Sequence, residues 1–458
     1  MKLCWSADNM FLTAPVEFVK AKPVAARQPI FDSRLRVFAY ELLFRSSLDN
    51  FFAFPDGDQA TSRVMDCVLS LGLDRLLAGH PAFINFTRET LIEDLATLLP
   101  AKHLTIEVLE SVKPDLEVLQ ACRHLKQLGY QLALDDVASL DFDNPLLGIA
   151  DIVKIDFSLA SESQKAGIPR QLRGRGIKLV AEKVEERQEF DRAVAWGYDY
   201  FQGFFFCSPQ MISARDIPAF KLNQLQLLKV LRRTELDYDE IEHILSRDLS
   251  FSYRLLRYLN SALFGLRSEV RSIRHALSML GEILIKRWVA MVVLAAIASD
   301  KPAELLRVAL LRARFCELLS APLVPRDEQG DFFLLGLFSV VDACLNQPMK
   351  VVAADLPLTP EVKDGLLGAG NVHGRVFQCV SAFERADWAA VAGLAGSLNL
   401  TAEFVGESYL QSLEWASEGL INCPPEPVHS RASLSVPCSD GQPGSVSPFL
   451  PRLQGRDS

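Results

Sequence analysis

Apolar and polar positions follow two different rhythms along the chain, and the rhythm changes near residue 215. From about Val24 to Ser208, short apolar or β-branched runs alternate with amphipathic stretches of helical period, an order that predicts βαβ units and a parallel sheet. Eight strands with intervening helices favour a closed α/β barrel over an open sheet. The eight runs are VAARQPIF, VFAYELLF, AFINF, LTIEVLE, QLALDD, DIVKID, KLVAEKV and YFQGFFF.

The second rhythm is helical. From about Phe220 to Gly419, apolar residues recur every three or four positions almost throughout, which predicts an all-α bundle. The last stretch is rich in Pro, Ser and Gly, a composition typical of disordered segments. We therefore expect four segments, namely an N-terminal extension over 1–21, a barrel over 22–215, a helical domain over 216–423 and a disordered tail over 424–458.

Composition and charge narrow the class of protein. The chain has 458 residues, of which 49% are hydrophobic and 23% charged, as expected for a globular protein of two or three domains. Its net charge of -9 disfavours a large nucleic-acid surface. The nine cysteines are scattered without a Cys-x-x-Cys pair, and the longest apolar run, Trp288–Ala298, is too short to span a membrane. We expect a cytoplasmic protein with reduced thiols and no membrane partner.

Polar side chains stand at or near the carboxyl end of the predicted strands. In a parallel barrel these ends open on one face, where active sites are built, so residues far apart in sequence would share a pocket. A single acid there is more simply explained as a helix N-cap, but its recurrence over seven segments favours a common site. These residues are Glu41, Asn85, Glu107, Asp135, Asp136, Lys154, Glu182 and Gln202.

This set of side chains suits hard cations. Carboxylates with a neutral amide are typical ligands of Mg²⁺ or Mn²⁺, and the additional acids allow a second ion bridged by an aspartate. Paired metals can activate water and stabilise the oxyanions of a phosphodiester displacement. A different class, a barrel glycosidase, would use Glu107 and Glu182 as its acid pair.

The motifs RQPIFD, ELLFR, INFT, IEVLE, LALDD, DIVKID, LVAEKVE and FQGFFFCSP follow one another in a fixed order. They resemble those of EAL domains, bacterial cyclic di-GMP phosphodiesterases, over about residues 22–215. The order of the motifs disfavours the glycosidase class. The resemblance implies that Glu41, Asn85, Glu107 and Asp135 are metal ligands and that Asp136 is a ligand of a second metal.

The same resemblance implies roles for the other mouth residues. Lys154 would lie beside the attacking water, and Glu182 would be the general base. Gln202 would be a partner of the metal site and would also bind the substrate. Arg45 would contact a nucleotide phosphate.

Two stretches depart from the EAL pattern. Active EAL domains usually follow the paired aspartates with Phe-Gly-Thr-Gly, where this chain has Val137-Ala138-Ser139-Leu140. Loss of both glycines makes positive φ angles costly and the same loop path unfavourable. Lys183 replaces the usual glycine after Glu182 and adds a positive charge. These departures predict a degenerate barrel that is weak or inactive as a hydrolase; the alternative is an active phosphodiesterase producing linear pGpG.

The helical part resembles the HDOD domain, a relative of HD phosphohydrolases. The matching residues are Leu255-Leu256-Arg257, Asn260-Ser261, Ser272-Ile273, Ala276 and Leu280-Gly281. HD hydrolases need adjacent His and Asp to bind metal, and no His-Asp dipeptide occurs in the chain, so we expect no cofactor there. His243 and His275 lie in helical patterns that favour packing or surface roles. The sequence thus predicts a signalling regulator that contacts an unidentified protein partner through this domain, with cyclic di-GMP as a ligand of the barrel.

Overall fold

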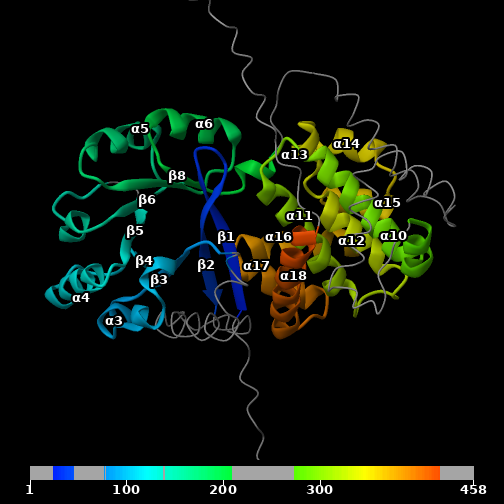
Figure 1. Ribbon diagram of the computed structural model, residues 1–458, viewed down its shortest axis with the longest axis horizontal. Helices are drawn as coiled ribbons and strands as arrows, with labels where there is room; N and C mark the ends of the chain where they lie inside the picture. The colour runs from blue at the N-terminus through cyan, green and yellow to red at the C-terminus, as the bar shows by residue number, and fades with distance from the viewer. Residues whose placement is uncertain (1–23, 46–76, 78, 138–139, 209–272, 423–458) are drawn as a thin grey trace, which may run out of the picture. The chain divides into compact units, whose positions relative to one another are not determined.

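The computed structural model describes residues 24–45, 77, 79–137, 140–208 and 273–422 (Figure 1). The predicted extension over 1–21 and the predicted tail over 424–458 lie outside the described residues. So do His243 and the HDOD motif residues from Leu255 to Ser272. The predicted domain boundaries therefore stay predictions.

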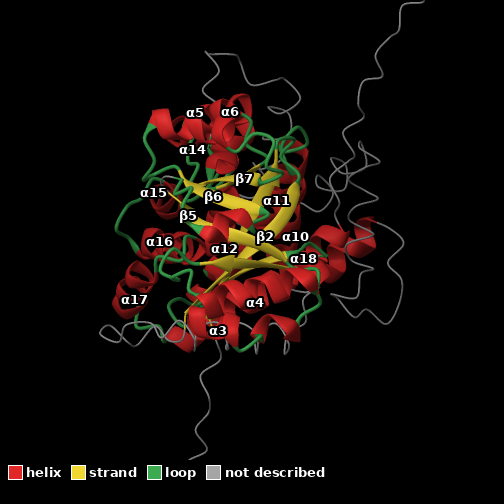
Figure 2. Cartoon of the chain, turned by 90° about the vertical axis from the view of Figure 1, so that its left-hand side faces the viewer, coloured by secondary structure: helices red, strands yellow, loops and turns green. Residues whose placement is uncertain are grey.

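The N-terminal part is the closed eight-stranded barrel that the sequence predicts, with its strands paired in chain order (Figures 1 and 2). The strands are β1 Val24–Asp32, β2 Val37–Arg45, β3 Ala82–Phe86, β4 Leu104–Val108, β5 Gln131–Val137, β6 Ile152–Asp156, β7 Lys178–Glu182 and β8 Tyr200–Gln202.

Strand β1 differs from the predicted all-parallel sheet. It runs antiparallel to both β2 and β8, whereas all the other neighbours are parallel. Only four residues join β1 to β2, which is too short for the crossover that a parallel pair requires. The Asp32 carboxylate holds this turn by accepting from the backbone N–H groups of Arg34 and Arg36, each at 2.9 Å. The hairpin makes the barrel mixed.

Helices cover the outside of the strands where the sequence supplies caps and an apolar face. In α4 (Leu116–Gln127), the Asp115 carboxylate accepts from the Val118 N–H at 3.0 Å, and Val118, Cys122 and Leu125 are buried on one face. The other described helical segments of this part are α3 Arg88–Ile92, α5 Glu162–Gln171, α6 Arg187–Trp196 and the 3₁₀ turns η1 Leu95–Leu98, η2 Ala101–His103, η3 Pro145–Gly148 and η4 Phe205–Cys207.

The barrel interior is filled by a separate cluster of buried apolar side chains. Because side chains alternate along a strand, the residue two positions further on faces the same interior. On five parallel strands this step leads from an apolar side chain to a polar one nearer the mouth. The pairs are Ala39 and Glu41, Phe83 and Asn85, Ala133 and Asp135, Ile152 and Lys154, and Val180 and Glu182.

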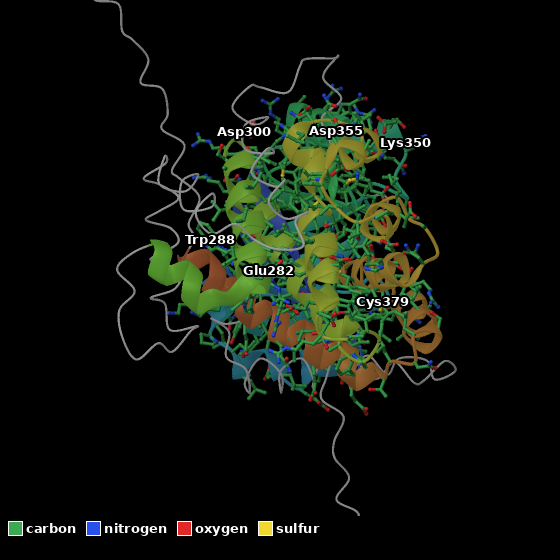
Figure 3. The ribbon with its side chains drawn as sticks, turned by 90° about the vertical axis from the view of Figure 1, so that its right-hand side faces the viewer. Glu282, Trp288, Asp300, Lys350, Asp355 and Cys379 are labelled. Carbon is green, nitrogen blue, oxygen red and sulfur yellow. The ribbon has the colours of Figure 1, made fainter. Side chains whose placement is uncertain are left out.

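The C-terminal part is helical, as the sequence predicts. Figure 3 shows these helices, with Trp288 on α10 buried in the core. A buried ion pair ties α11 to α16, since the Arg312 guanidinium donates to both carboxylate oxygens of Glu384 at 2.7 to 3.0 Å. The helices are α10 Ile273–Ile297, α11 Ala303–Ser320, α12 Gln329–Phe338, α13 Val341–Leu345, α14 Met349–Asp355, α15 Pro360–Leu366, α16 Val372–Glu384, α17 Trp388–Ser397 and α18 Ala402–Asn422.

Strands β1 and β2 contact helices of the C-terminal part within one compact unit that covers residues 1–425. The Tyr40 hydroxyl donates to the Glu304 carboxylate at 3.0 Å, and the Arg27 backbone N–H donates to the Tyr409 hydroxyl at 3.2 Å. The Gln28 amide donates to the main-chain carbonyl of Glu384 at 3.0 Å. The β1–β2 hairpin therefore closes the barrel and also contacts the helices of the C-terminal part.

Among the helices that the structure describes, no single one has both the length and the apolar composition of a membrane span. Helices α17 and α18 reach that length and composition only when they are taken together, across a bend of 109°.

The close approach of α12 to α11 requires glycine at one position. A Cβ added at Gly336 would lie 2.3 Å from the Arg312 carbonyl oxygen, whereas a Cβ at Gly330, in the same helix, would meet nothing within 4 Å. We expect Gly336→Ala to lower the free energy of unfolding by about 1–3 kcal/mol through overpacking. Gly330→Ala should change it by less than about 1 kcal/mol, in the stabilising direction. Urea unfolding followed by circular dichroism measures both, and equal effects would contradict the close approach.

Candidate functional site

The predicted site residues meet at the mouth of the barrel around the ammonium group of Lys154. This side chain is fully buried and is surrounded by four carboxylates from four other strands. Its Nζ lies 2.5 Å from Glu107 Oε1, 2.8 Å from Asp135 Oδ1, 2.8 Å from Glu182 Oε1 and 3.2 Å from Glu41 Oε2. One lysine thus joins β2, β4, β5 and β7 at the centre of the barrel.

Amide side chains orient the Glu41 carboxylate at the edge of this group. Gln202 Nε2 donates to Glu41 Oε2 at 2.6 Å, and Asn85 Nδ2 lies 3.4 Å from Glu41 Oε1. Gln202 Nε2 also donates to Gln28 Oε1 at 3.1 Å. Both oxygens of Glu41 therefore have a fixed direction.

The group contains four acids and one ammonium. Burial, followed by the neighbouring Glu41 carboxylate, raises the pKa of Glu107 well above its ordinary value. Burial also raises the pKa of Glu182 to about 8, although the Lys154 ammonium opposes this shift. Burial by itself lowers the pKa of Lys154, but the surrounding carboxylates outweigh it and raise that pKa well above the ordinary value. A single ammonium does not balance four buried carboxylates, so the site favours additional positive charge.

The geometry fits a divalent cation. Carboxylate oxygens of Glu41, Glu107 and Asp135 lie within 4.8 Å of one another, and so do those of Asp135, Asp136 and Glu182. Glu107 Oε2 and Glu182 Oε2 are buried and accept no hydrogen bond from the described residues. Leaving such oxygens without a partner is costly, and hard cations prefer ligands of this kind. These residues can therefore hold Mg²⁺ or Mn²⁺.

The outer edge of the mouth has a second lysine. Lys183 directly follows β7, and its Nζ lies 3.2 Å from Asp136 Oδ1 and 2.5 Å from Asp156 Oδ2. Asp156, which is fully buried, also accepts from the Ser158 hydroxyl at 2.6 Å. Burial lowers the pKa of Lys183, but hydrogen bonds and charges of Asp156 and Asp136 outweigh it and raise the pKa overall. Lys183 therefore stays charged beside Asp136.

The structure brings together all but one of the residues that the sequence singled out. The exception is Arg45, which ends β2 and whose side chain lies outside the described residues, as do Ala138 and Ser139 of the altered loop. Sequence reasoning missed Gln28 and Asp156. Gln28 lies at the middle of β1, paired with Glu41 of β2 in the antiparallel register, and its polar side chain within a mostly apolar run is the signal that could have found it.

Comparison with known families agrees with this architecture. The family model described as EAL domain matches residues 26–209, and the model described as HDOD domain matches residues 217–345. His275, Ala276 and Gly281 of the second match lie in α10, where their side chains are outside the described residues.

Two relatives match this chain over nearly the whole of their own length. The uncharacterized protein YuxH of Bacillus subtilis is 35% identical over 85% of this chain and 97% of its own. The cyclic di-GMP phosphodiesterase CdgJ of Vibrio cholerae is 32% identical over 91% of this chain and 99% of its own. The chain belongs to the family of proteins in which an EAL domain is followed by an HDOD domain.

Among solved structures, a calcium and cyclic di-GMP complex of Klebsiella pneumoniae BlrP1 is similar to this chain. It is 24% identical, with a TM-score of 0.34, over 42% of this chain and 57% of its own.

If the buried carboxylates hold a cation, neutralising one of them should abolish that binding without unfolding the protein. We expect Mn²⁺ to raise the melting temperature of the wild type by roughly 5 °C, since saturating ligand adds about 2–3 kcal/mol of stability. Glu107→Gln should keep or increase the melting temperature in EDTA and lose the Mn²⁺ response. The exposed Glu93 provides a matched control, because Glu93→Gln should retain the response. A Glu107→Gln protein that still responds to Mn²⁺ would contradict this assignment.

Proposed function

We propose that the barrel is a cation-dependent cyclic di-GMP phosphodiesterase, which adds water across one phosphodiester bond of the cyclic dinucleotide to give linear pGpG. The observation that carries this proposal is the ring of buried carboxylates around Lys154, in which Glu107 Oε2 and Glu182 Oε2 accept no hydrogen bond from any described residue. The relative CdgJ, named as such a phosphodiesterase, supports the choice of substrate.

The roles of the residues follow from their positions. Glu41, Asn85, Glu107 and Asp135 would hold the first cation. When bound, such a cation lowers the pKa of a water molecule and stabilises negative charge on the phosphate oxygens.

Glu182 would take the proton of the attacking water. Its raised pKa of about 8 makes its carboxylate a stronger base than an exposed glutamate, and its Oε2 accepts no hydrogen bond from the described residues. The water oxygen forms a bond to phosphorus, the bond from phosphorus to the ribose 3′ oxygen breaks, and that oxygen takes up a proton. Lys154 would hold Glu182 and Asp135 in place and stabilise the developing charge through its ammonium.

A second candidate is a regulator that binds cyclic di-GMP, turns it over weakly or not at all, and acts on a signalling protein through the HDOD domain. The Lys183 ion pair with Asp136 favours this candidate, since it engages a carboxylate expected to be a ligand. Gln28 favours it as well, because its side chain joins Gln202 at the mouth to the main chain of Glu384 in α16. A displacement of α16 would thus be transmitted to the site through the hydrogen bonds of Gln28.

A hydrolysis assay distinguishes the two candidates. Purified full-length protein is incubated with cyclic di-GMP and Mg²⁺ or Mn²⁺, and linear pGpG is measured by chromatography. We expect metal-dependent pGpG formation that Glu41→Gln lowers by about 100-fold or more, since even a residue that merely orients a metal ligand contributes about 10–100-fold. Glu93→Gln should retain the wild-type rate.

Binding is measured in parallel by titration calorimetry with cyclic di-GMP and Ca²⁺. Saturable binding without any pGpG would support the regulator and contradict the phosphodiesterase. Turnover that survives Glu41→Gln would contradict the assignment of the site itself.

A further inference from the structure

Two residues at the barrel mouth have backbone conformations that L-amino acids disfavour, and they bind each other. Asp136 has φ of 49° and Lys183 has φ of 52°, and neither is glycine. The left-handed conformation brings the Cβ of an L-residue close to the following carbonyl oxygen and is therefore disfavoured outside glycine. Their side chains meet through Lys183 Nζ and Asp136 Oδ1 at 3.2 Å. The chain thus sustains strain at the ends of β5 and β7 where these two charges pair.

An ordinary surface ion pair does not account for this arrangement. The Lys183 and Asp136 side chains are 53% and 41% exposed, and pairs so accessible to water contribute little to stability. The Lys183 ammonium is also held by Asp156, whose side chain is fully buried. Asp156 itself is fixed by the Ser158 N–H and hydroxyl. The Lys183 ammonium is therefore held by the buried carboxylate of Asp156 as well as by the exposed carboxylate of Asp136.

The position of this ammonium bears on the cations that the mouth can hold. Asp136 belongs to the second carboxylate group, with Asp135 and Glu182, and not to the first group of Glu41, Glu107 and Asp135. A cation on Asp136 would lie about 2.0–2.6 Å from its oxygen, within a few ångströms of Lys183 Nζ. Two positive charges at such a separation repel each other. Lys183 and a second divalent cation thus compete for one carboxylate.

Lys154 contacts members of both carboxylate groups and so does not distinguish them, whereas Lys183 pairs with a member of the second group. Among the described residues, Lys183 forms ion pairs with Asp136 and Asp156 only, and Glu107 Oε2 accepts no hydrogen bond from them. We infer that Lys183 is a built-in cation that replaces the second divalent ion, so that the mouth binds one divalent cation instead of two. This inference rests on the proposed function, because it specifies the cation content of the same site.

The test counts bound Mn²⁺ on the full-length protein. Free Mn²⁺ is measured by electron paramagnetic resonance during titration, without substrate and without any assay of activity. We expect one Mn²⁺ per wild-type chain and two per chain in Lys183→Gly, where glycine also relieves the left-handed strain. Asp136→Asn, added to Lys183→Gly, should return the number to one. Lys183→Arg should keep it at one, because it preserves the charge.

The matched control is Lys178→Ala. Lys178 begins the same strand β7 and pairs with Asp199 at 2.7 Å, so its loss changes the net charge by the same amount away from the mouth. This variant should bind one Mn²⁺. Melting curves of each variant identify any that fail to fold, and in that case Lys183→Ala takes the place of Lys183→Gly.

The outcomes separate the two proposals. Two Mn²⁺ bound by the wild type, or one bound by both the wild type and a folded Lys183→Gly, would overturn the role of Lys183 while leaving the phosphodiesterase proposal intact. An absence of Mn²⁺ binding in every folded variant would overturn the cation site and the proposed function with it. One Mn²⁺ in the wild type and two in Lys183→Gly would support the inference even if no pGpG forms.

Discussion

The buried ammonium of Lys154 is the interaction on which the barrel mouth depends. It lies within 3.2 Å of carboxylates on four other strands, so a shift of any of them would leave a buried charge without its partner. A slip of one residue in register would also turn the carboxylate of that strand away from the interior. The same lysine cannot balance all four acids. The charge that remains is what makes this mouth suited to a divalent cation.

Reversal of β1 gives the site its connection to the helices. Because β1 runs antiparallel, the step from the apolar Ile30 towards the mouth leads two positions back along the chain, to Gln28, which pairs with Glu41. Gln28 binds Gln202 on one side and the main chain of Glu384 on the other. Glu384 is held in turn by Arg312 through a buried ion pair. The helical part thus contacts the mouth through a short series of hydrogen bonds.

The departures from the EAL pattern do not displace the acids of the barrel mouth. The acids around Lys154 are in place, and the change at Lys183 adds a positive charge where a second ion would otherwise be favoured. In our inference, a fixed ammonium takes the place of one divalent cation and is held by Asp156 and Asp136. Such a fixed ammonium cannot activate a water molecule as a metal does. The two functional candidates therefore differ in the degree of turnover more than in the architecture of the mouth.

The sequence by itself determined the eight strands, the succession of a barrel by a helical part and the convergence of Glu41, Glu107, Asp135, Lys154 and Glu182. These follow from local periodicity and from the geometry of a barrel, in which successive strand ends meet at one rim. Only the tertiary structure decided the direction of β1, the use of Gln28 and Asp156, and the pairing of Lys183 with Asp136. Each of these depends on which side chains from distant strands come within hydrogen-bonding distance, and that distance is set by register and closure, which no local pattern encodes.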